Sequence, residues 1–208
     1  MHGAGMNYLG HLYLADPDPQ HRLGGMIGDW VKGRLDGHDL PARVRDGVSR
    51  HRAVDHYSDT HPVMRRARAR FAGRHRRVAG IALDVLWDHF LIRHWERFGD
   101  TSLDAFLDEC YGELLTVVHH CPEPMADRVR RIVHDDWIRG YRELDQVGHA
   151  LRRVGGRLSR DPGLHDIIHE IVPLYGALEA DFLRFPLLQP GRCPAWDLNV
   201  PWNDSAKS

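Results

Sequence analysis

The chain has 208 residues and a formal net charge of −1, with 42% hydrophobic and 27% charged residues. This composition excludes a disordered chain, and no apolar run reaches the roughly 18 residues that a membrane-spanning helix needs. Three widely spaced cysteines argue against a disulfide framework or a thiolate zinc site, and a net charge near zero gives no reason to expect a nucleic-acid partner.

Helical periodicity runs through nearly the whole chain, and no alternating strand pattern is found. In chain order, the expected helices cover residues 6–15, 21–33, 39–60, 76–98, 102–119, 125–133, 138–158 and 164–185. An arginine-rich segment, residues 63–77, leads into the expected helix 76–98. Residues 1–5 form an N-terminal extension, and residues 187–208, which contain several prolines and two tryptophans, form a C-terminal tail. We therefore predict an all-α fold with a single-domain helical bundle over residues 6–186.

The expected helix 39–60 carries polar residues on its buried face. Val44, Val48, His51 and Asp55 follow 4-3-4 spacing and so share one side, which the valines mark as inward. A carboxylate taken out of water needs a strong partner. His51 and Asp55 therefore belong either to a metal or catalytic site or to a His–Asp or Arg–Asp pair that ties two helices together.

The expected helix 76–98 is apolar on every side between Ile81 and Trp95, yet it contains Asp84, Asp88 and His89. Asp84 and Asp88 are one turn apart on the same face. Two adjacent buried carboxylates require a cation, which is a metal ion, an arginine or a protonated histidine. The sequence leaves these three choices open.

Two further candidates lie near the N-terminus. His11 stands among leucines, and Asp29 follows Gly28 within an apolar segment. The complete set predicted to face inward from helices is His11, Asp29, His51, Asp55, Asp84, Asp88 and His89. Mixed imidazole and carboxylate ligands suit Mn²⁺, Fe or Zn²⁺ better than Ca²⁺, and a thiolate-free site with open positions is typical of catalysis.

Several competing catalytic motifs are absent from the sequence. The chain has no H-E-x-x-H, no E-x-x-H, no P-loop and no G-x-S-x-G. The glycine-containing run 24–28 is too short and in the wrong context for a dinucleotide turn. Zincin proteases, ferritin-like di-iron bundles and nucleotide-binding loops are therefore disfavoured.

Four segments, taken in this order and spacing, carry a family resemblance. They are MNYLGHL at 6–12, GDWVKG at 28–33, HRAVD at 51–55 and LDVLWDHFL at 83–91. Together they resemble the acyl carrier protein phosphodiesterases. The resemblance implies hydrolysis of the phosphodiester between 4′-phosphopantetheine and a carrier-protein serine, which gives apo carrier protein and 4′-phosphopantetheine.

The resemblance also implies a cofactor, a fold and site roles. Mn²⁺ is the implied metal, with Fe, Zn²⁺ and Mg²⁺ as alternatives, and the implied fold is a bundle distantly related to the HD-type phosphohydrolases. By motif position the metal ligands are His11, Asp29, His51, Asp55, Asp88 and His89. Asp29, Asp84 and Asp88 are catalytic candidates, and Arg52 is a candidate for stabilising phosphoryl charge. Because the doublet runs Asp88-His89 rather than His-Asp, HD-type ligand roles do not transfer one to one.

A concentrated group of arginines follows the expected helix 39–60. It comprises Arg65, Arg66, Arg68, Arg70, Arg74, Arg76 and Arg77, with no acid between Asp59 and Asp84. Acyl carrier proteins are acidic, so this segment is a candidate docking patch. A solvated helix face is the alternative, whereas the absence of interleaved aromatics other than Phe71 disfavours a nucleic-acid site.

Two other functions remain open at the level of sequence: an HD-like metal phosphohydrolase of nucleotides or small phosphoesters, and a non-enzymatic bundle that binds metal or protein. The N-terminal segment lacks the basic start of a signal peptide, so a cytoplasmic protein with no membrane contact is expected. The sequence gives no oligomeric state.

Overall fold

The computed structural model describes residues 7–156 and 163–188. Within these ranges the chain forms α-helices and short 3-10 helices and contains no β-strand, which confirms the all-α prediction. The α-helices are α1 (Tyr8–Leu14), α2 (Pro19–Ile27), α3 (Ala42–Thr60), α4 (Pro62–Ala69), α5 (Ala79–Arg93), α6 (Leu103–Val117), α7 (Glu123–His134), α8 (Trp137–Gly140), α9 (Leu144–Gly155) and α10 (Ile168–Leu183).

Five 3-10 turns connect or extend these helices: η1 (Leu35–Gly37), η2 (His75–Arg77), η3 (Trp95–Arg97), η4 (Val118–His120) and η5 (Pro186–Leu188). None of the described helices combines the length and apolar character that a bilayer span requires. The predicted extension at residues 1–5 and most of the predicted tail, residues 189–208, lie outside the described residues.

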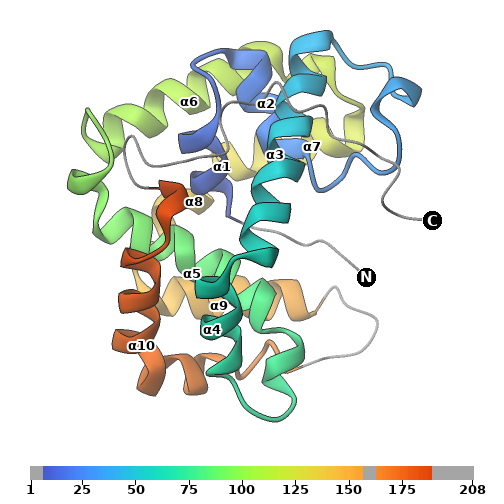
Figure 1. The fold of residues 1–208 in the computed structure, drawn as a ribbon. Helices are drawn as coiled ribbons and strands as arrows, with labels where there is room; N and C mark the ends of the chain where they lie inside the picture. Colours follow the sequence, from blue (N-terminus) through green and yellow to red (C-terminus); the bar gives the residue numbers. More distant parts are fainter. Residues whose placement is uncertain (1–6, 157–162, 189–208) are drawn as a thin grey trace.

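The helices gather in two groups around α5. In Figure 1, α1, α2, α3, α6 and α7 lie in the upper part of the molecule, while α4, α9 and α10 lie in the lower part. Helix α2 packs on α1, α3 and α6, and α5 contacts α1, α4, α9 and α10. Because α5 contributes apolar side chains on most of its sides, it joins the two groups through the buried core.

Local sequence determines where several helices begin. The Asp18 carboxylate accepts the backbone N–H of His21 at the start of α2, and the Ser102 hydroxyl accepts that of Ala105 at the start of α6. Pro19 occupies the first turn of α2, where its missing N–H costs no hydrogen bond.

Glycines allow α2 and α3 to approach closely. A Cβ at Gly24 would lie 2.2 Å from the Val44 carbonyl oxygen, and one at Gly47 would lie 2.1 Å from the His21 carbonyl oxygen. The two helices therefore meet backbone to backbone, and only glycine fits at the contact. This packing explains part of the glycine run 24–28.

Two predicted helices differ from those in the structure, and one segment without a predicted helix is helical. The predicted helix 21–33 ends at Ile27, so Asp29 lies in the turn that follows α2 and not on a helix. The arginine-rich segment 63–77 contains most of α4 and all of η2, with Gly73 between them at a φ of +50°. The predicted helix 138–158 divides into α8 and α9.

Candidate active site

Two histidines and a carboxylate converge between α1 and α3. The rings of His11 and His51 stack with their centroids 3.8 Å apart. The Asp55 carboxylate lies beside both, with Oδ1 3.3 Å from His11 Nε2 and Oδ2 3.2 Å from His51 Nε2. The i, i+4 spacing of His51 and Asp55 along α3 puts both side chains on the face toward α1.

Asp29 completes this group from the turn after α2. Its Oδ1 lies 3.5 Å from His51 Nε2, and its side chain is only 10% exposed. We call His11, Asp29, His51 and Asp55 the imidazole–carboxylate cluster. Its four side chains come from three separate segments that the close packing of α1, α2 and α3 brings together.

The surrounding backbone fixes the orientation of His51. Its Nδ1 lies 2.8 Å from the Gly25 carbonyl oxygen, which only accepts, so Nδ1 carries the hydrogen and donates it. This leaves Nε2 to face Asp29 and Asp55. A Cβ at Gly28 would lie 2.3 Å from the His51 ring, so glycine at position 28 makes room for the imidazole.

The cluster has the features of a cation site. The Nε2 atoms of His11 and His51 are buried, and neither is aligned for a hydrogen bond with a described residue. Ligand atoms of His11, His51 and Asp55 all lie within 4.8 Å of one another. Two unpartnered imidazole nitrogens beside carboxylates form a donor set that suits a divalent transition metal, with the other nitrogen of His51 held by a carbonyl as in metal sites generally.

Electrostatics in the cluster favour a positive charge. Burial alone would lower the pKa of His51, but the carboxylates of Asp29 and Asp55 outweigh it and hold this pKa well above the usual range. Burial and the neighbouring His51 lower the pKa of His11. Burial opposes ionisation of Asp55, yet the two imidazoles hold its pKa below the usual range. The two carboxylates therefore favour a positive charge at His51 Nε2.

Asp84 lies near the cluster on α5 and is partly exposed. No described residue makes a hydrogen bond to its carboxylate. Burial and the negative charges of Asp55 and Asp29 raise the pKa of Asp84 well above its usual value, although Arg68 acts in the opposite direction. This carboxyl is therefore suited to holding a proton beside the cluster.

The structure places Asp88 elsewhere. Its carboxylate is fully buried and accepts the backbone N–H groups of Leu9 and Gly10, each at 2.9 Å, at the start of α1. Burial raises the pKa of Asp88 to about 8, while these two hydrogen bonds act to lower it. Asp88 thus caps α1, the helix that carries His11, and does not reach the two imidazoles.

His89 is also separate from the cluster. Its Nδ1 donates to the Tyr141 carbonyl oxygen at 2.7 Å, and its Nε2 lies 2.6 Å from the Tyr175 hydroxyl. Both ring nitrogens are used in contacts with neighbouring helices. The prediction that His89 points inward is therefore confirmed, but its side chain does not join the imidazole–carboxylate cluster.

Arg52 points toward the turn that holds Asp29. Its Nη2 donates to the carbonyl oxygens of Val31 at 3.0 Å and Gly33 at 2.8 Å. These bonds tie α3 to the segment that follows Asp29. In this structure Arg52 positions that segment, while a contact with a phosphoryl group remains a prediction.

Four of the seven clustered arginines form ion pairs. Arg66 and Arg70 both bind Asp181, Arg68 binds Asp59, and Arg74 binds Asp166. Two of these acids lie more than ninety positions away in the sequence. The absence of acids near the arginines in the sequence therefore did not show that the arginines lack acidic partners in the fold. Arg65, Arg76 and Arg77 are exposed and form no ion pair with any residue in the described part of the chain.

Sequence reasoning missed a pocket beside the cluster. Asn7, Ser58 and Trp87 contribute polar groups to its lining, together with Asp84 and Asp88. Asn7 and Trp87 both fall within the segments that carried the family resemblance. Periodicity could not show that residues so far apart in the chain border one cavity.

Comparisons with known proteins agree with the motif evidence. The sequence model of a family described as "Acyl carrier protein phosphodiesterase" matches residues 6–187. The chain belongs to this family. A protein of that name from Salmonella agona (strain SL483) is 34% identical over 181 residues, which cover 86% of this chain and 93% of the relative.

A second relative of the same name, from Serratia proteamaculans (strain 568), is 36% identical over the same shares of the two chains. No solved structure gives a significant match. The family match confirms the resemblance read from the four segments, and with it the prediction of a phosphodiesterase. All four members of the imidazole–carboxylate cluster lie within the matched residues.

Proposed function

We propose that this protein hydrolyses the phosphodiester between 4′-phosphopantetheine and a serine of acyl carrier protein. The observation that carries the proposal is the imidazole–carboxylate cluster, where two buried Nε2 atoms lack hydrogen-bond partners among the described residues. A purely structural His–Asp pair would satisfy these atoms. The family match supplies the substrate class.

We further propose that His11, Asp29, His51 and Asp55 hold a divalent metal, with Mn²⁺ the first choice and Fe, Zn²⁺ and Mg²⁺ as alternatives. Such an ion, when bound, polarises a phosphoryl oxygen and lowers the pKa of a water molecule. The Gly25 carbonyl keeps His51 Nε2 free to act as a ligand. Arg52 keeps the turn that carries Asp29 close to α3.

Asp84 is proposed as the proton-transfer group. Its carboxyl borders the pocket and holds a proton more readily than an ordinary aspartic acid, because burial and nearby carboxylates disfavour its charged form. A proton on Asp84 is available to the serine oxygen as the phosphodiester breaks. In this role Asp84 acts as a general acid, whereas a general base would require its carboxylate to be ionised.

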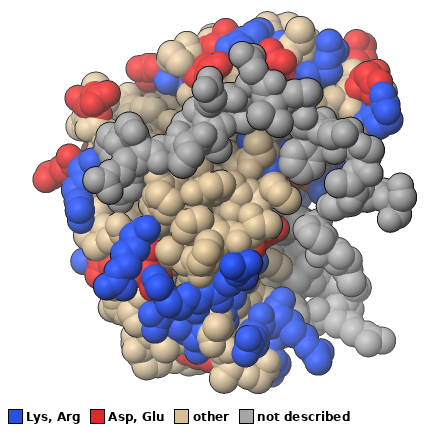
Figure 2. Space-filling model, in the orientation of Figure 1, with Lys and Arg blue, Asp and Glu red and all other residues tan. Residues whose placement is uncertain are grey.

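The proposed docking surface for the carrier protein is smaller than the sequence suggested. Figure 2 shows arginine side chains gathered over α4 and the segment that follows it. Within this group, Arg65, Arg76 and Arg77 offer charge that no described acid neutralises. We propose that these three attract an acidic carrier protein, while Arg66, Arg68, Arg70 and Arg74 mainly join segments of the fold.

The decisive experiment incubates the protein with holo acyl carrier protein and Mn²⁺ and follows the carrier by mass spectrometry. The expected result is conversion to the apo mass, and a chelator should abolish it. Conversion of nucleotides with no action on the carrier would favour a small-phosphoester hydrolase. Absence of both turnover and bound metal would favour a non-enzymatic bundle.

A further inference from the structure

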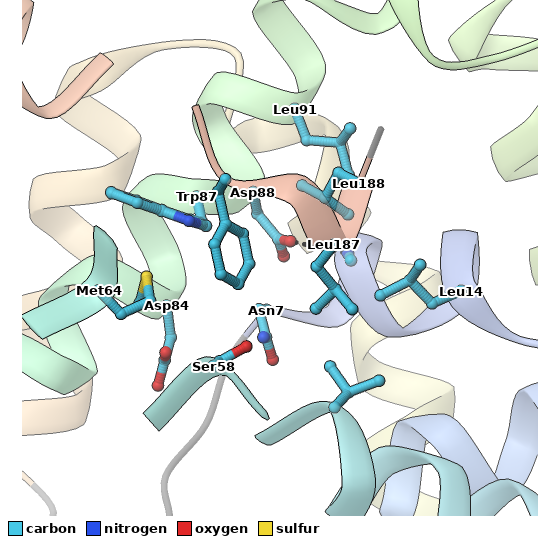
Figure 3. Close-up of a pocket in the computed structure, with 13 residues that line it drawn as sticks. Asn7, Leu14, Ser58, Met64, Asp84, Trp87, Asp88, Leu91, Leu187 and Leu188 are labelled. Carbon is cyan, nitrogen blue, oxygen red and sulfur yellow. Dashed lines mark hydrogen bonds between the residues drawn. The ribbon is translucent and has the colours of Figure 1, made fainter. Parts of the chain in front are cut away.

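The pocket beside the cluster combines apolar walls with a few polar groups. Leu14, Val54, Leu91 and Leu187 are among the apolar side chains that line it. Figure 3 shows Leu14, Leu91 and Leu187 around a space that Asn7, Ser58 and the two α5 aspartates also border. Such a surface suits a flexible ligand that alternates apolar and polar groups.

Two polar atoms in this pocket lack partners. Trp87 is 6% exposed, and its buried Nε1–H donates to no described residue. The Asn7 Oδ1 atom is buried and accepts no hydrogen bond within the described chain. Since buried polar groups in folded proteins are nearly always paired, an unused donor and an unused acceptor in one cavity indicate a ligand.

The position of Asn7 strengthens this reading. Asn7 stands at the N-cap of α1, where an asparagine side chain ordinarily accepts a backbone N–H from the first turn. Here it makes no such bond, because the Asp88 carboxylate takes the N–H groups of Leu9 and Gly10 instead. The Asn7 amide is thereby released from capping and borders the pocket.

We propose that this pocket binds the amide-bearing pantetheine arm of the substrate, and that Trp87 and Asn7 form hydrogen bonds with its amide groups. Trp87 Nε1–H donates to an amide carbonyl, and the Asn7 Oδ1 accepts an amide N–H. The inference rests on the proposed function, because 4′-phosphopantetheine carries two secondary amides separated by two methylene groups, and a dimethyl-substituted carbon between these amides and the phosphate. The apolar walls cover those carbon groups.

The pocket is also correctly placed for this ligand. Val54 precedes Asp55 on α3, and Asp84 borders the pocket while lying within electrostatic range of Asp29 and Asp55. An arm lying in the pocket therefore brings its phosphate end toward the imidazole–carboxylate cluster. Trp87 and Asn7 are specificity-determining residues in this arrangement, since they contact the arm and not the reacting phosphorus.

The test compares two substrates in the full chain. Trp87→Phe removes the N–H and keeps an aromatic ring, and it should raise KM for holo carrier protein about ten-fold with a much smaller effect on kcat. Bis(p-nitrophenyl) phosphate has no amide arm, so its KM should change several-fold less. Asn7→Ala should likewise raise KM for holo carrier protein more than KM for bis(p-nitrophenyl) phosphate.

Trp95→Phe is the matched control. The Trp95 Nε1–H already donates to the Thr101 carbonyl oxygen at 2.8 Å, and this residue does not line the pocket. Its loss should leave the ratio of the two KM values unchanged. Circular dichroism of all three variants verifies that each retains its helices.

Free pantetheine provides a direct binding readout. It should inhibit cleavage of the small phosphodiester by the wild-type protein and by Trp95→Phe, and about ten-fold more weakly in Trp87→Phe. Equal inhibition of all three proteins, or equal KM changes for both substrates in Trp87→Phe, would overturn the pocket assignment. Pantetheine inhibition without any turnover of holo carrier protein would overturn the proposed function and leave the pocket assignment standing.

Discussion

Two regions of this protein bring histidines and carboxylates together and differ in how these charged groups are hydrogen-bonded. One is the imidazole–carboxylate cluster between α1, α2 and α3. The other, which we call the α4–α10 seam, joins α4 and η2 to α10 and consists of Arg66, Arg70, Arg74, His75, Asp166, Glu170 and Asp181.

In the seam, charged groups meet partners of opposite sign. Asp181 has no exposed surface, and its carboxylate accepts from Arg66 at 2.9 Å and from Arg70 at 2.7 Å. His75 contacts both Asp166 and Glu170. In the cluster, by contrast, the Nε2 atoms of His11 and His51 lie 3.2 to 3.5 Å from carboxylate oxygens but form no aligned hydrogen bond with a described residue. Complete hydrogen bonding of charged groups is typical of a structural role, whereas buried imidazole nitrogens without an aligned hydrogen bond are typical of a ligand-binding site.

The largest expected effect tests the cluster. Asp55→Asn keeps the shape of the side chain but removes its charge, so kcat/KM toward holo carrier protein should fall at least about 1,000-fold. Calorimetry should show that Mn²⁺ binding is lost as well. Asp46→Asn, an exposed change on the same helix, is the matched control and should retain both turnover and Mn²⁺ binding. Wild-type Mn²⁺ affinity in Asp55→Asn would remove Asp55 from the ligand set.

The seam should respond in stability rather than in activity. Asp181→Ala leaves two arginines without their buried partner, and the free energy of unfolding should fall by about 2 to 3 kcal/mol. Chemical denaturation measures this loss. Asp127→Ala removes an exposed partner of Arg130 on α7 and should cost less than about 0.5 kcal/mol. A similar small loss for Asp181→Ala would show that the seam contributes little.

A smaller effect is expected where the seam meets solvent. Reversing charge at Arg76 and Arg77 together should raise KM for the carrier protein roughly five- to ten-fold at low salt, because these exposed side chains attract an acidic partner. The KM for bis(p-nitrophenyl) phosphate should stay constant. Arg130→Glu, on α7 in the opposite part of Figure 1, should affect neither substrate. Equal effects on both substrates would place these arginines inside the catalytic pocket.

The smallest effect is a pH dependence of the seam. Burial acts to lower the pKa of His75, but hydrogen bonds with Asp166 and Glu170 outweigh it and raise this pKa. A raised pKa means that the stabilisation is fully present below the unfolded value near 6.5 and is lost as pH rises through the folded value. His75→Gln should therefore cost about 1 kcal/mol or less near pH 6, and denaturation at pH 9 should show a smaller difference from the wild type. A constant difference across this range would contradict the assignment.

Periodicity predicted much of the helical framework and three of the four residues of the imidazole–carboxylate cluster. His51 and Asp55 are recognisable because the valines of the same stripe mark their face as buried. His11 was found on an apolar face in the same way. Asp29 was correctly selected but placed on a helix, because nothing in residues 21–33 showed that α2 ends at Ile27.

Other features depended on contacts that no local pattern contains. The sequence shows that Asp88 and His89 point inward, but only the packing shows that Asp88 binds the start of α1 and that His89 binds Tyr141 and Tyr175. The acids that neutralise the arginines, Asp166 and Asp181, also come from distant positions. Pairing across the fold decides function here, and helical spacing alone does not encode it.

The capping of α1 by Asp88 has a consequence for mutational scans. Helix α1 has seven residues, too few to be stable alone, and it carries His11. Replacing Asp88 would release the start of this helix and displace the imidazole, so activity would disappear without any loss of a metal ligand or proton donor. A screen that scores only turnover would group Asp88 with the residues of the cluster, and measurement of the order of α1 would separate them.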